Sequence, residues 1–401
     1  MTITQTREPS PVLGSEQEIV AAARSLADEL RPRASDVDRA GVVPFDALER
    51  VRLSGLLTIN VPEWAGGAGA SNQTVIEVLR LLGTGDPSVA LLTFVHYTII
   101  FAVTERGSQE LQSRLFTEVL AGARIGNAAA EREVAKAGAL STSISVGEDG
   151  VWRINGRKYY ATAAKGADWV GVGTLDPEGR MVIALVPGDS EGLTVLDDWD
   201  SVGMRATQSG SLILVNVVVE PDNIVEFWRS FEEPALWLAR DGLLHHAVDV
   251  GAARTALADT VQYVRTTAKP ARTAGVERAA DDPLLVSRVG ELTARLHAAE
   301  QLLERGARAI DTAAQADPLT ATEVAIAFAA ADASKALGGE IAAEIANEVI
   351  GVGGTRAADD QLNLHRHWRN IRTHTVHDPG RWRYHRLGNF VLDGPGLDHE
   401  R

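Results

Sequence analysis

A short stretch near the C-terminal end, NLHRHWRNIRTHTVHDPGRW (residues 363–382), concentrates side chains that could do chemistry. It holds four histidines, four arginines and two tryptophans. Because an imidazole titrates near neutral pH, it can donate or accept a hydrogen bond, move a proton or ligate a metal. A closing surface helix needs no such density of charged and aromatic groups, so this stretch is the first candidate for a functional site.

The spacing within the stretch favours one polar face of a helix. His374 and His377 are three residues apart and would share a helix face, which Arg366 and Asn370 extend toward the N-terminus. An Asp-Pro pair follows, so we expect the helix to end near His377. A polar stripe running to a helix end is well placed to line a pocket. The alternative is a solvated face that carries structural histidines.

Metal ligation is the least favoured use of these histidines. His365 and His367 would point to different helix faces, and no suitably spaced carboxylate completes a site with His374 and His377. The chain has no cysteine, which excludes disulfides, thiolate metal sites and a cysteine nucleophile.

Composition limits the possible partners. The net charge of −15 argues against a broad basic surface, so neither nucleic acid nor an anionic membrane is an expected partner. The polar N-terminus, MTITQTREPSPVLG, lacks the apolar core of a signal peptide, and we expect no run long enough to span a membrane. A cytoplasmic location is the resulting expectation.

The elements that must position the candidate residues change character along the chain. Residues 1–125 are predicted to form an N-terminal helical domain. SEQEIVAAARSLADEL begins with a Ser15 cap and Glu18 three residues later. NQTVIEVLRLLGTGD, the strongly apolar SVALLTFVHYTIIFAV with its single His96, and QELQSRLFTEVLAG follow as helices.

Residues 126–225 read as a small middle β domain. WVGVGTL, MVIALVPG and GSLILVNVVVEP are short β-rich runs separated by Gly, Pro and Asp. VWRINGRKYYAT alternates around Asn155-Gly156, which predicts a hairpin turn there.

Residues 226–401 return to helical periodicity. The segments 241–266, 284–315 and 319–349 are rich in Ala and Leu and longer than an average globular helix, which suits a C-terminal helical bundle. The order helices, strands, long helices predicts an α+β fold with the β domain inserted between two helical parts.

Four segments resemble the acyl-CoA dehydrogenase superfamily in order and position. They are GARIGNAAAE (122–131), INGRKYYATAAKGADW (154–169), DDWDSVGMRATQSGSLILVNVVVEPDNIV (197–225) and NEVIGVGGTR (347–356). The resemblance covers nearly the whole chain. It implies a helical domain, a middle β domain and a C-terminal four-helix bundle, usually assembled as a homotetramer.

The histidine-rich stretch narrows the resemblance to one branch. LHRHWRNIRTHTVHDPGRWRYHRLGNF and GVERAADDP (275–283) are similar to the flavin-dependent monooxygenases on this fold, which include dibenzothiophene monooxygenase and the sulfur-acquisition oxidoreductases. The branch implies oxygenation of a sulfur, or a nitrogen, atom of a small apolar substrate by O2 and reduced flavin through a flavin hydroperoxide. No dinucleotide fingerprint is present, so a separate flavin reductase would supply reduced FMN, and FAD remains possible.

An acyl-CoA dehydrogenase would instead need a carboxylate base beside the substrate. In many members this glutamate lies near the C-terminus, where this chain reads RTHTVH (372–377). Others place it early in the first bundle helix, where Asp241 is the nearest acid and is short for the task. An FAD-dependent dehydrogenase with a relocated base is therefore the second hypothesis.

The resemblance implies catalytic roles for His96, Asn127, Thr162, His374 and His377. We expect His377 to lie nearest the flavin ring edge and His374 one turn back on the same face, with Asn127 and Thr162 approaching from the β domain to close the site. The alternatives are a core histidine at position 96 and a turn asparagine at position 127. The resemblance also puts Tyr97 on the substrate side and Tyr160 and Trp199 near the ring. The alternative for the latter two is ordinary core packing, which is equally plausible for Trp199.

The flavin phosphate needs cationic or backbone donors. The resemblance assigns it to Gly353, Gly354 and Arg356, with Lys269 or the nearby Arg272 in place of an arginine of the branch. In the superfamily these groups come partly from a neighbouring subunit, so a single chain is expected to lack a complete site.

Overall fold

The computed structural model describes residues 9–136 and 138–394. The start of the polar N-terminal stretch, residues 1–8, lies outside the described part. The N-terminal zone is helical, and the Ser15 hydroxyl caps its first helix by accepting a hydrogen bond from Glu18 N. Its helices are α1 (Glu16–Leu30), α2 (Ala34–Ala40), α3 (Phe45–Leu53), α4 (Asn72–Gly85), α5 (Pro87–Arg106) and α6 (Gln109–Leu120).

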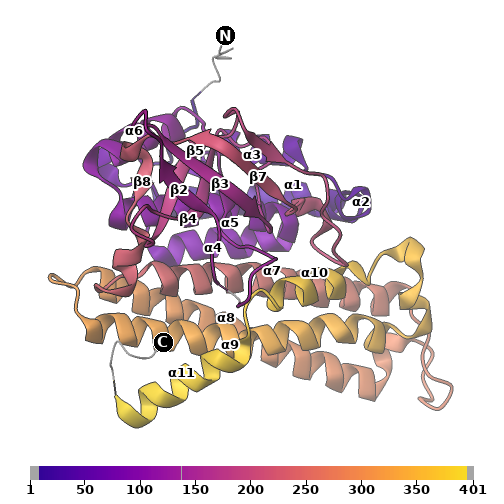
Figure 1. Ribbon diagram of the computed structural model, residues 1–401. Helices are drawn as coiled ribbons and strands as arrows, with labels where there is room; N and C mark the ends of the chain where they lie inside the picture. Colours follow the sequence, from indigo (N-terminus) through magenta and orange to yellow (C-terminus); the bar gives the residue numbers. More distant parts are fainter. Residues whose placement is uncertain (1–8, 137, 395–401) are drawn as a thin grey trace.

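A mixed sheet follows and lies beside these helices, above the long helices in Figure 1. Its strand order is β6-β7-β3-β2-β4-β5-β8, and β1 also pairs with β4 in parallel. The strands are β1 (Ile125–Ala128), β2 (Ser143–Val146), β3 (Trp152–Lys158), β4 (Trp169–Leu175), β5 (Met181–Pro187), β6 (Leu193–Val195), β7 (Leu212–Val218) and β8 (Ile224–Val225).

Three long helices dominate the last zone, as the segment lengths predicted. They are α7 (Trp237–Thr266), α8 (Pro283–Ala314) and α9 (Ala321–Gly353), and two shorter helices follow, α10 (Arg366–Thr375) and α11 (Gly380–Asp393). α10 packs on α7 and α9, and α11 packs on α9. The predicted α+β class, with a sheet between two helical parts, is confirmed.

Two expectations about local structure were wrong. Asn155 and Gly156 form no hairpin turn but lie inside β3, where the pairing with β7 shifts register between Ile154 and Gly156. A side chain at Gly156 would overlap Thr142, whose Oγ1 would be 2.3 Å from the added Cβ, so the glycine permits close packing at an irregular strand.

The second wrong expectation concerns membrane spans. α5 is long and apolar enough to cross a bilayer by length and composition, but 89% of that window is buried inside the fold. α4 and α5 both pack on α7, and one hydrophobic cluster joins the N-terminal helices to the bundle. The apolar character of α5 therefore reflects its position in the core.

Candidate active site

The predicted polar stripe of α10 joins the bundle to the β domain. Arg366 donates to Asp259 on α7, and the Asn370 side chain accepts from Met204 N, which belongs to the loop between β6 and β7. Gly203 in that loop lies so close to α10 that an added Cβ would be 2.0 Å from Arg369 O. The glycine thus allows the loop to lie directly against the helix.

A histidine cluster, consisting of His245, His374 and His377, lies where α10 meets α7. His374 Nδ1 lies 2.8 Å from Oδ1 of Asp249, and His374 Nε2 lies 2.9 Å from His245 Nδ1. The ring of His245 also contacts Phe94 and His377, with centroids 4.0 Å and 3.9 Å away. Asp249, His374 and His245 therefore form one hydrogen-bonded line, and His377 lies against its end.

Burial and nearby charges favour the neutral form of His245. Burial, followed by His377 and Lys335, holds the pKa of His245 well below its ordinary value. Burial also raises the pKa of Asp241 to about 6, although Lys335 opposes that shift. Lys335 is itself buried, with Nζ 3.4 Å from Oδ1 of Asp378. A neutral His245 follows from these surroundings.

His377 differs from its two partners because it reaches the surface. α10 ends at Thr375, as expected to within two residues, so His377 lies in the following turn and donates its backbone N–H to His374 O. Its residue is exposed, and its ring has no hydrogen-bond partner among the described residues. The protein packed around the inner side of the ring, with Lys335, lowers its pKa. His377 is thus the open ring of the cluster.

The β domain brings Asn127 and Thr162 together, as the resemblance implied. Asn127 N donates to Thr162 O over 3.0 Å. The Thr162 hydroxyl lies 2.8 Å from that of Ser209, which donates to Thr207. The Asn127 side chain is half-buried and has no hydrogen-bond partner in the described part of the chain. The Asn127 amide, which has no partner in the described part, therefore lies near a chain of hydrogen-bonded hydroxyl groups.

The two loops at this place hold a strained backbone. Tyr160, Ala163, Met204 and Gln208 have φ values of 62°, 59°, 52° and 46°. Side chains other than glycine rarely adopt this left-handed region, and such residues gather at functional sites. Ala163 therefore adopts a backbone conformation that glycine favours. Tyr160 is 51% exposed, and its ring centroid lies 6.0 Å from that of Trp199.

His96 and Tyr97 have structural partners instead of free polar groups. His96 donates from Nε2 to Leu57 O and accepts from Ile125 N at Nδ1, and burial lowers its pKa to about 4. Tyr97 is fully buried and donates its hydroxyl to Leu56 O. These contacts favour the packing interpretation for both residues.

The predicted phosphate residues lie at the other end of the bundle. Gly353 ends α9 beside Tyr263 of α7, where an added Cβ would be 3.4 Å from the tyrosine ring, and Gly354 has open space around it. Lys269 and Arg356 are exposed cations, as is Arg272. Tyr263 is about 27 Å along α7 from His245, at roughly 1.5 Å per residue. Within a single chain, the predicted phosphate residues therefore lie far from the histidine cluster.

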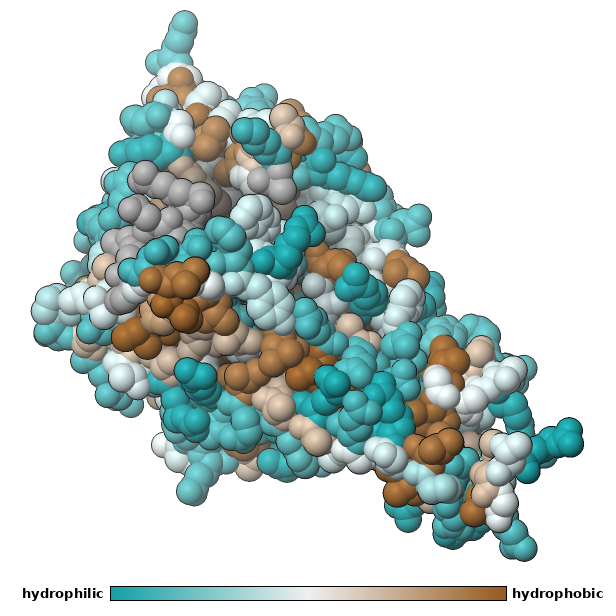
Figure 2. Space-filling model, turned by 90° about the horizontal axis from the view of Figure 1, so that it is seen from below, coloured by the Kyte–Doolittle hydropathy of each residue, from teal (hydrophilic) through white to brown (hydrophobic). Residues whose placement is uncertain are grey.

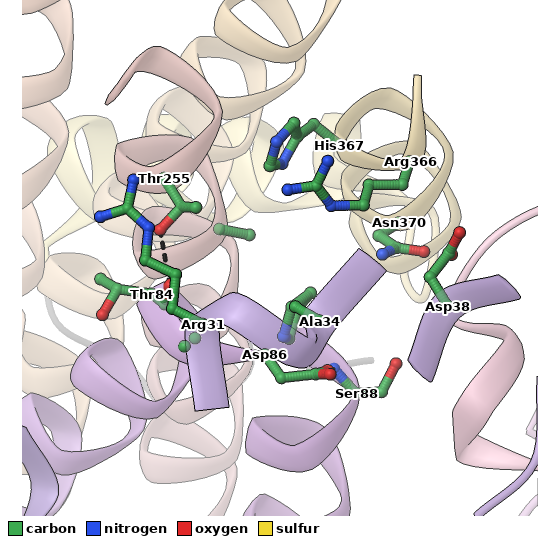
Figure 3. Close-up of a pocket in the computed structure, with 14 residues that line it drawn as sticks. Arg31, Ala34, Asp38, Thr84, Asp86, Ser88, Thr255, Arg366, His367 and Asn370 are labelled. Carbon is green, nitrogen blue, oxygen red and sulfur yellow. Dashed lines mark hydrogen bonds between the residues drawn. The ribbon is translucent and has the colours of Figure 1, made fainter. Parts of the chain in front are cut away.

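A polar pocket lies along the first turns of α10 (Figure 3) and contains no residue of the histidine cluster. Its charged groups are paired within the protein. Asp259 accepts from Arg31, Arg366 and His367, while Asp86 caps α5. Buried charged groups are usually retained only when they have partners. The polar groups around this pocket therefore serve to hold α10 against α7.

Sequence reasoning missed His245 and Asp249 of α7 and considered Asp241 only as a possible dehydrogenase base. In DGLLHHAVDVG, Asp241, His245 and Asp249 recur every fourth residue and so share one helix face. This signal was present in the sequence but was not used. Ser209 and Lys335 had no comparable pattern. Within the described residues no group of three or more His, Asp or Glu side chains is arranged to hold a metal ion.

Family models match in three consecutive parts of the chain. The N-terminal domain of acyl-CoA dehydrogenase matches residues 15–123, the middle domain matches residues 128–217, and the C-terminal domain matches residues 243–379.

Individual relatives narrow the match. A dibenzothiophene monooxygenase of Rhodococcus erythropolis is 32% identical, over 98% of each chain. A probable FMNH2-dependent monooxygenase, SfnC, of Pseudomonas putida is 29% identical, over 96% of this chain and 97% of its own. The crystal structure of FMN-bound TdsC from Paenibacillus sp. A11-2 superposes with a TM-score of 0.89 at 29% identity, over 94% of this chain and 99% of that one. The chain belongs to the acyl-CoA dehydrogenase superfamily, in the branch that contains dibenzothiophene monooxygenase.

Proposed function

We propose that this protein is a two-component monooxygenase that uses reduced FMN and O2 to oxygenate a sulfur, or a nitrogen, atom of a small substrate. The observation that carries the proposal is the open imidazole of His377, backed by a buried hydrogen-bonded line, where a dehydrogenase would need a carboxylate. The relatives support it, since one is named for dibenzothiophene and another for FMNH2.

The donor set fits FMN. At the near end, Asn127 offers a free amide and Thr162 a hydroxyl beside exposed Tyr160, which suits a flat heteroaromatic ring with polar edges. At the far end, the buried hydroxyl of Tyr263 has no partner among the described residues, the Tyr263 ring lies beside Gly353, and Arg356 is exposed. Cations with a hydroxyl and glycine backbone suit a phosphate.

FMN in its reduced form supplies the two electrons that split O2, so that one oxygen atom enters the substrate and the other leaves as water. The chain's own task is then to exclude water and to hold or deliver a proton. His377 is the side chain placed for that task, because its ring is open. His374 uses both ring nitrogens within the line, so its role is to position and not to donate directly.

We further infer a homotetramer in which each site uses two chains. The separation of about 27 Å along α7 keeps the phosphate residues from reaching the flavin that His377 of the same chain faces. Large apolar side chains are exposed on the long-helix side, where Figure 2 shows brown patches. They include Leu284 and Val286 of α8, Ile326 and Leu337 of α9, and Trp382, Val391 and Leu392 of α11. Burying such surface would stabilise an assembly.

A separate flavin reductase would supply the reduced FMN, and a cytoplasmic location would give it access to that enzyme. FAD remains a possible occupant of the same site. The dehydrogenase alternative would use Asp241 as its base, but this carboxylate faces His245 Nε2 at 4.0 Å.

Titrating the purified protein with reduced FMN under air tests the proposal. With dibenzothiophene present, we expect an oxygenated product whose yield depends on FMNH2, and a protein that is colourless as purified. A tightly bound yellow FAD, together with dehydrogenation of an acyl-CoA and no oxygenated product from any small sulfide, would contradict it.

A further inference from the structure

The hydrogen-bonded line has one consistent arrangement of protons when its histidines are neutral. A carboxylate only accepts, so the proton of His374 lies on Nδ1, facing Asp249. His374 Nε2 is then bare and accepts from Nδ1–H of His245. The remaining nitrogen of His245, Nε2, carries no proton and faces Oδ2 of Asp241 at 4.0 Å. Asp249 thus sets the tautomer of two histidines in succession.

The tautomer of His245 matters because its ring lies 3.9 Å from that of His377. Two imidazolium ions at that distance would repel each other, so only one ring of the pair can carry an added proton. His245 is enclosed by Phe94 and the line, whereas His377 reaches solvent. The charged groups facing the pair are Asp241 and Asp249 of α7, Lys335 of α9, Asp378 of the turn after α10, and Arg383 of α11.

We propose that Asp249 and His245 are positioning residues of the oxygenation site, which act through His374 to hold His245 neutral and leave the mobile proton to His377. The proposal rests on the proposed function and extends it to two residues of α7. Neither residue is expected to touch the cofactor. Their influence passes through direct contacts: from Asp249 to His374, from His374 to His245, and by ring contact from His245 to His377.

Two substitutions separate this role from simple packing. Asp249→Asn keeps the shape of the side chain, but its amide can donate to His374 Nδ1 and so reverse every proton in the line. His245→Phe keeps a flat ring against Phe94 and His377 and removes both nitrogens. His297→Gln, at an exposed position of α8, is the matched control.

The first readout needs no cofactor. Solid-state NMR of protein labelled with 15N-histidine distinguishes protonated from bare ring nitrogens, and His245→Phe and His374→Gln assign the signals. We expect the proton on Nδ1 of both His374 and His245 in the wild type, and on Nε2 of both in Asp249→Asn. Unchanged tautomers in Asp249→Asn, or the Nε2 tautomer already in the wild type, would overturn the proposal.

The second readout is the rate of dibenzothiophene oxygenation, measured together with the amount oxygenated per FMNH2 consumed. We expect the oxygenation rate to fall about 10²-fold in Asp249→Asn and in His245→Phe, with FMN affinity unchanged, and to stay at the wild-type value in His297→Gln. Wild-type rates in both variants would overturn the proposal. If the wild type oxygenates no small sulfide, the proposed function is wrong. The NMR result still shows whether Asp249 sets the tautomers of His374 and His245.

Discussion

The two ends of α7 differ in how completely one chain builds them. At the near end, His245 and Asp249 are buried and hydrogen-bonded within the chain, and α10 completes the arrangement. At the far end, Lys269 and Arg356 are exposed, and the buried hydroxyl of Tyr263 has no partner in the described part. Figure 1 shows the α7–α8 loop and the segment after α9 at the right end of the bundle, away from the sheet.

This difference supports the proposal that each site uses groups from two chains. The near end needs rigid, prearranged groups because it would control the position of a proton. All of these groups come from one chain. Among the described residues, the far end carries cations and a hydroxyl without partners, which are costly or idle in an isolated chain. Under the proposed function, another copy would bring a flavin phosphate to these groups.

The largest expected effect comes from recombining the two ends. His377→Ala damages the near end and Arg356→Ala damages the far end, so each homotetramer should be impaired. In hybrids made by co-expressing the two variants with different affinity tags, some sites combine an intact near end with an intact far end from the other chain. We expect oxygenation above that of either parent. Hybrids no more active than the mean of the parents would show that each site uses one chain.

Between the two ends of α7, the Asp259 side chain holds α10 against α7 through hydrogen bonds. Burial raises the pKa of the Asp259 carboxyl, but the hydrogen bonds from His367 and Arg31 and the charge of Arg366 lower it more. The pKa of Asp259 therefore lies well below the ordinary value. We expect Asp259→Ala to lower the free energy of unfolding by about 3 kcal/mol at neutral pH, because buried donors lose their acceptor. Urea unfolding measures this, with exposed Asp28→Ala as control.

The pH dependence follows from the direction of that shift. A group with a lowered folded pKa stabilises the fold above its unfolded value, near pH 4, and loses that contribution as pH falls through the folded value. The difference in the free energy of unfolding between wild type and Asp259→Ala should therefore be constant from about pH 5 to 7. It should become smaller below about pH 4. A gap that widens on acidification would contradict the assignment.

Phosphate binding should show a smaller effect. Arg356→Ala should weaken FMN binding by about 1.5–3 kcal/mol, because a phosphate loses a charge-assisted partner. Lys269→Ala should do the same, and Arg272→Ala should have less effect if Lys269 holds the phosphate. Fluorescence titration with FMN measures all three. Unchanged affinity in both Arg356→Ala and Lys269→Ala would mean that the phosphate lies elsewhere.

The smallest effect is expected at Tyr263. Its hydroxyl has no partner among residues 9–136 and 138–394, so Tyr263→Phe should not destabilise the fold. If the hydroxyl binds the phosphate brought by another copy, FMN affinity should fall by about 0.5–1.5 kcal/mol. A variant with unchanged FMN affinity would remove Tyr263 from the site.

Sequence patterns predicted the long helices and the strand zone because burial imposes periodicity on them. The prediction of a turn at Asn155-Gly156 was wrong because the pairing of β3 with β7 overrides the local turn propensity. The cluster was only half predicted, because His374 and His377 lie in a dense motif whereas His245 lies among apolar residues of α7. Contacts between such distant segments depend on packing, which no local pattern contains.

The central claim is that His377 controls oxygenation, and one measurement tests it most directly: the amount of product formed per FMNH2 consumed by His377→Ala, compared with wild type. We predict that the oxygenation rate falls about 10²–10⁴-fold, that hydrogen peroxide appears instead of product, and that FMN affinity is largely kept. If His377→Ala and His374→Ala both keep the wild-type ratio of product to FMNH2, the histidines are structural and the account is wrong.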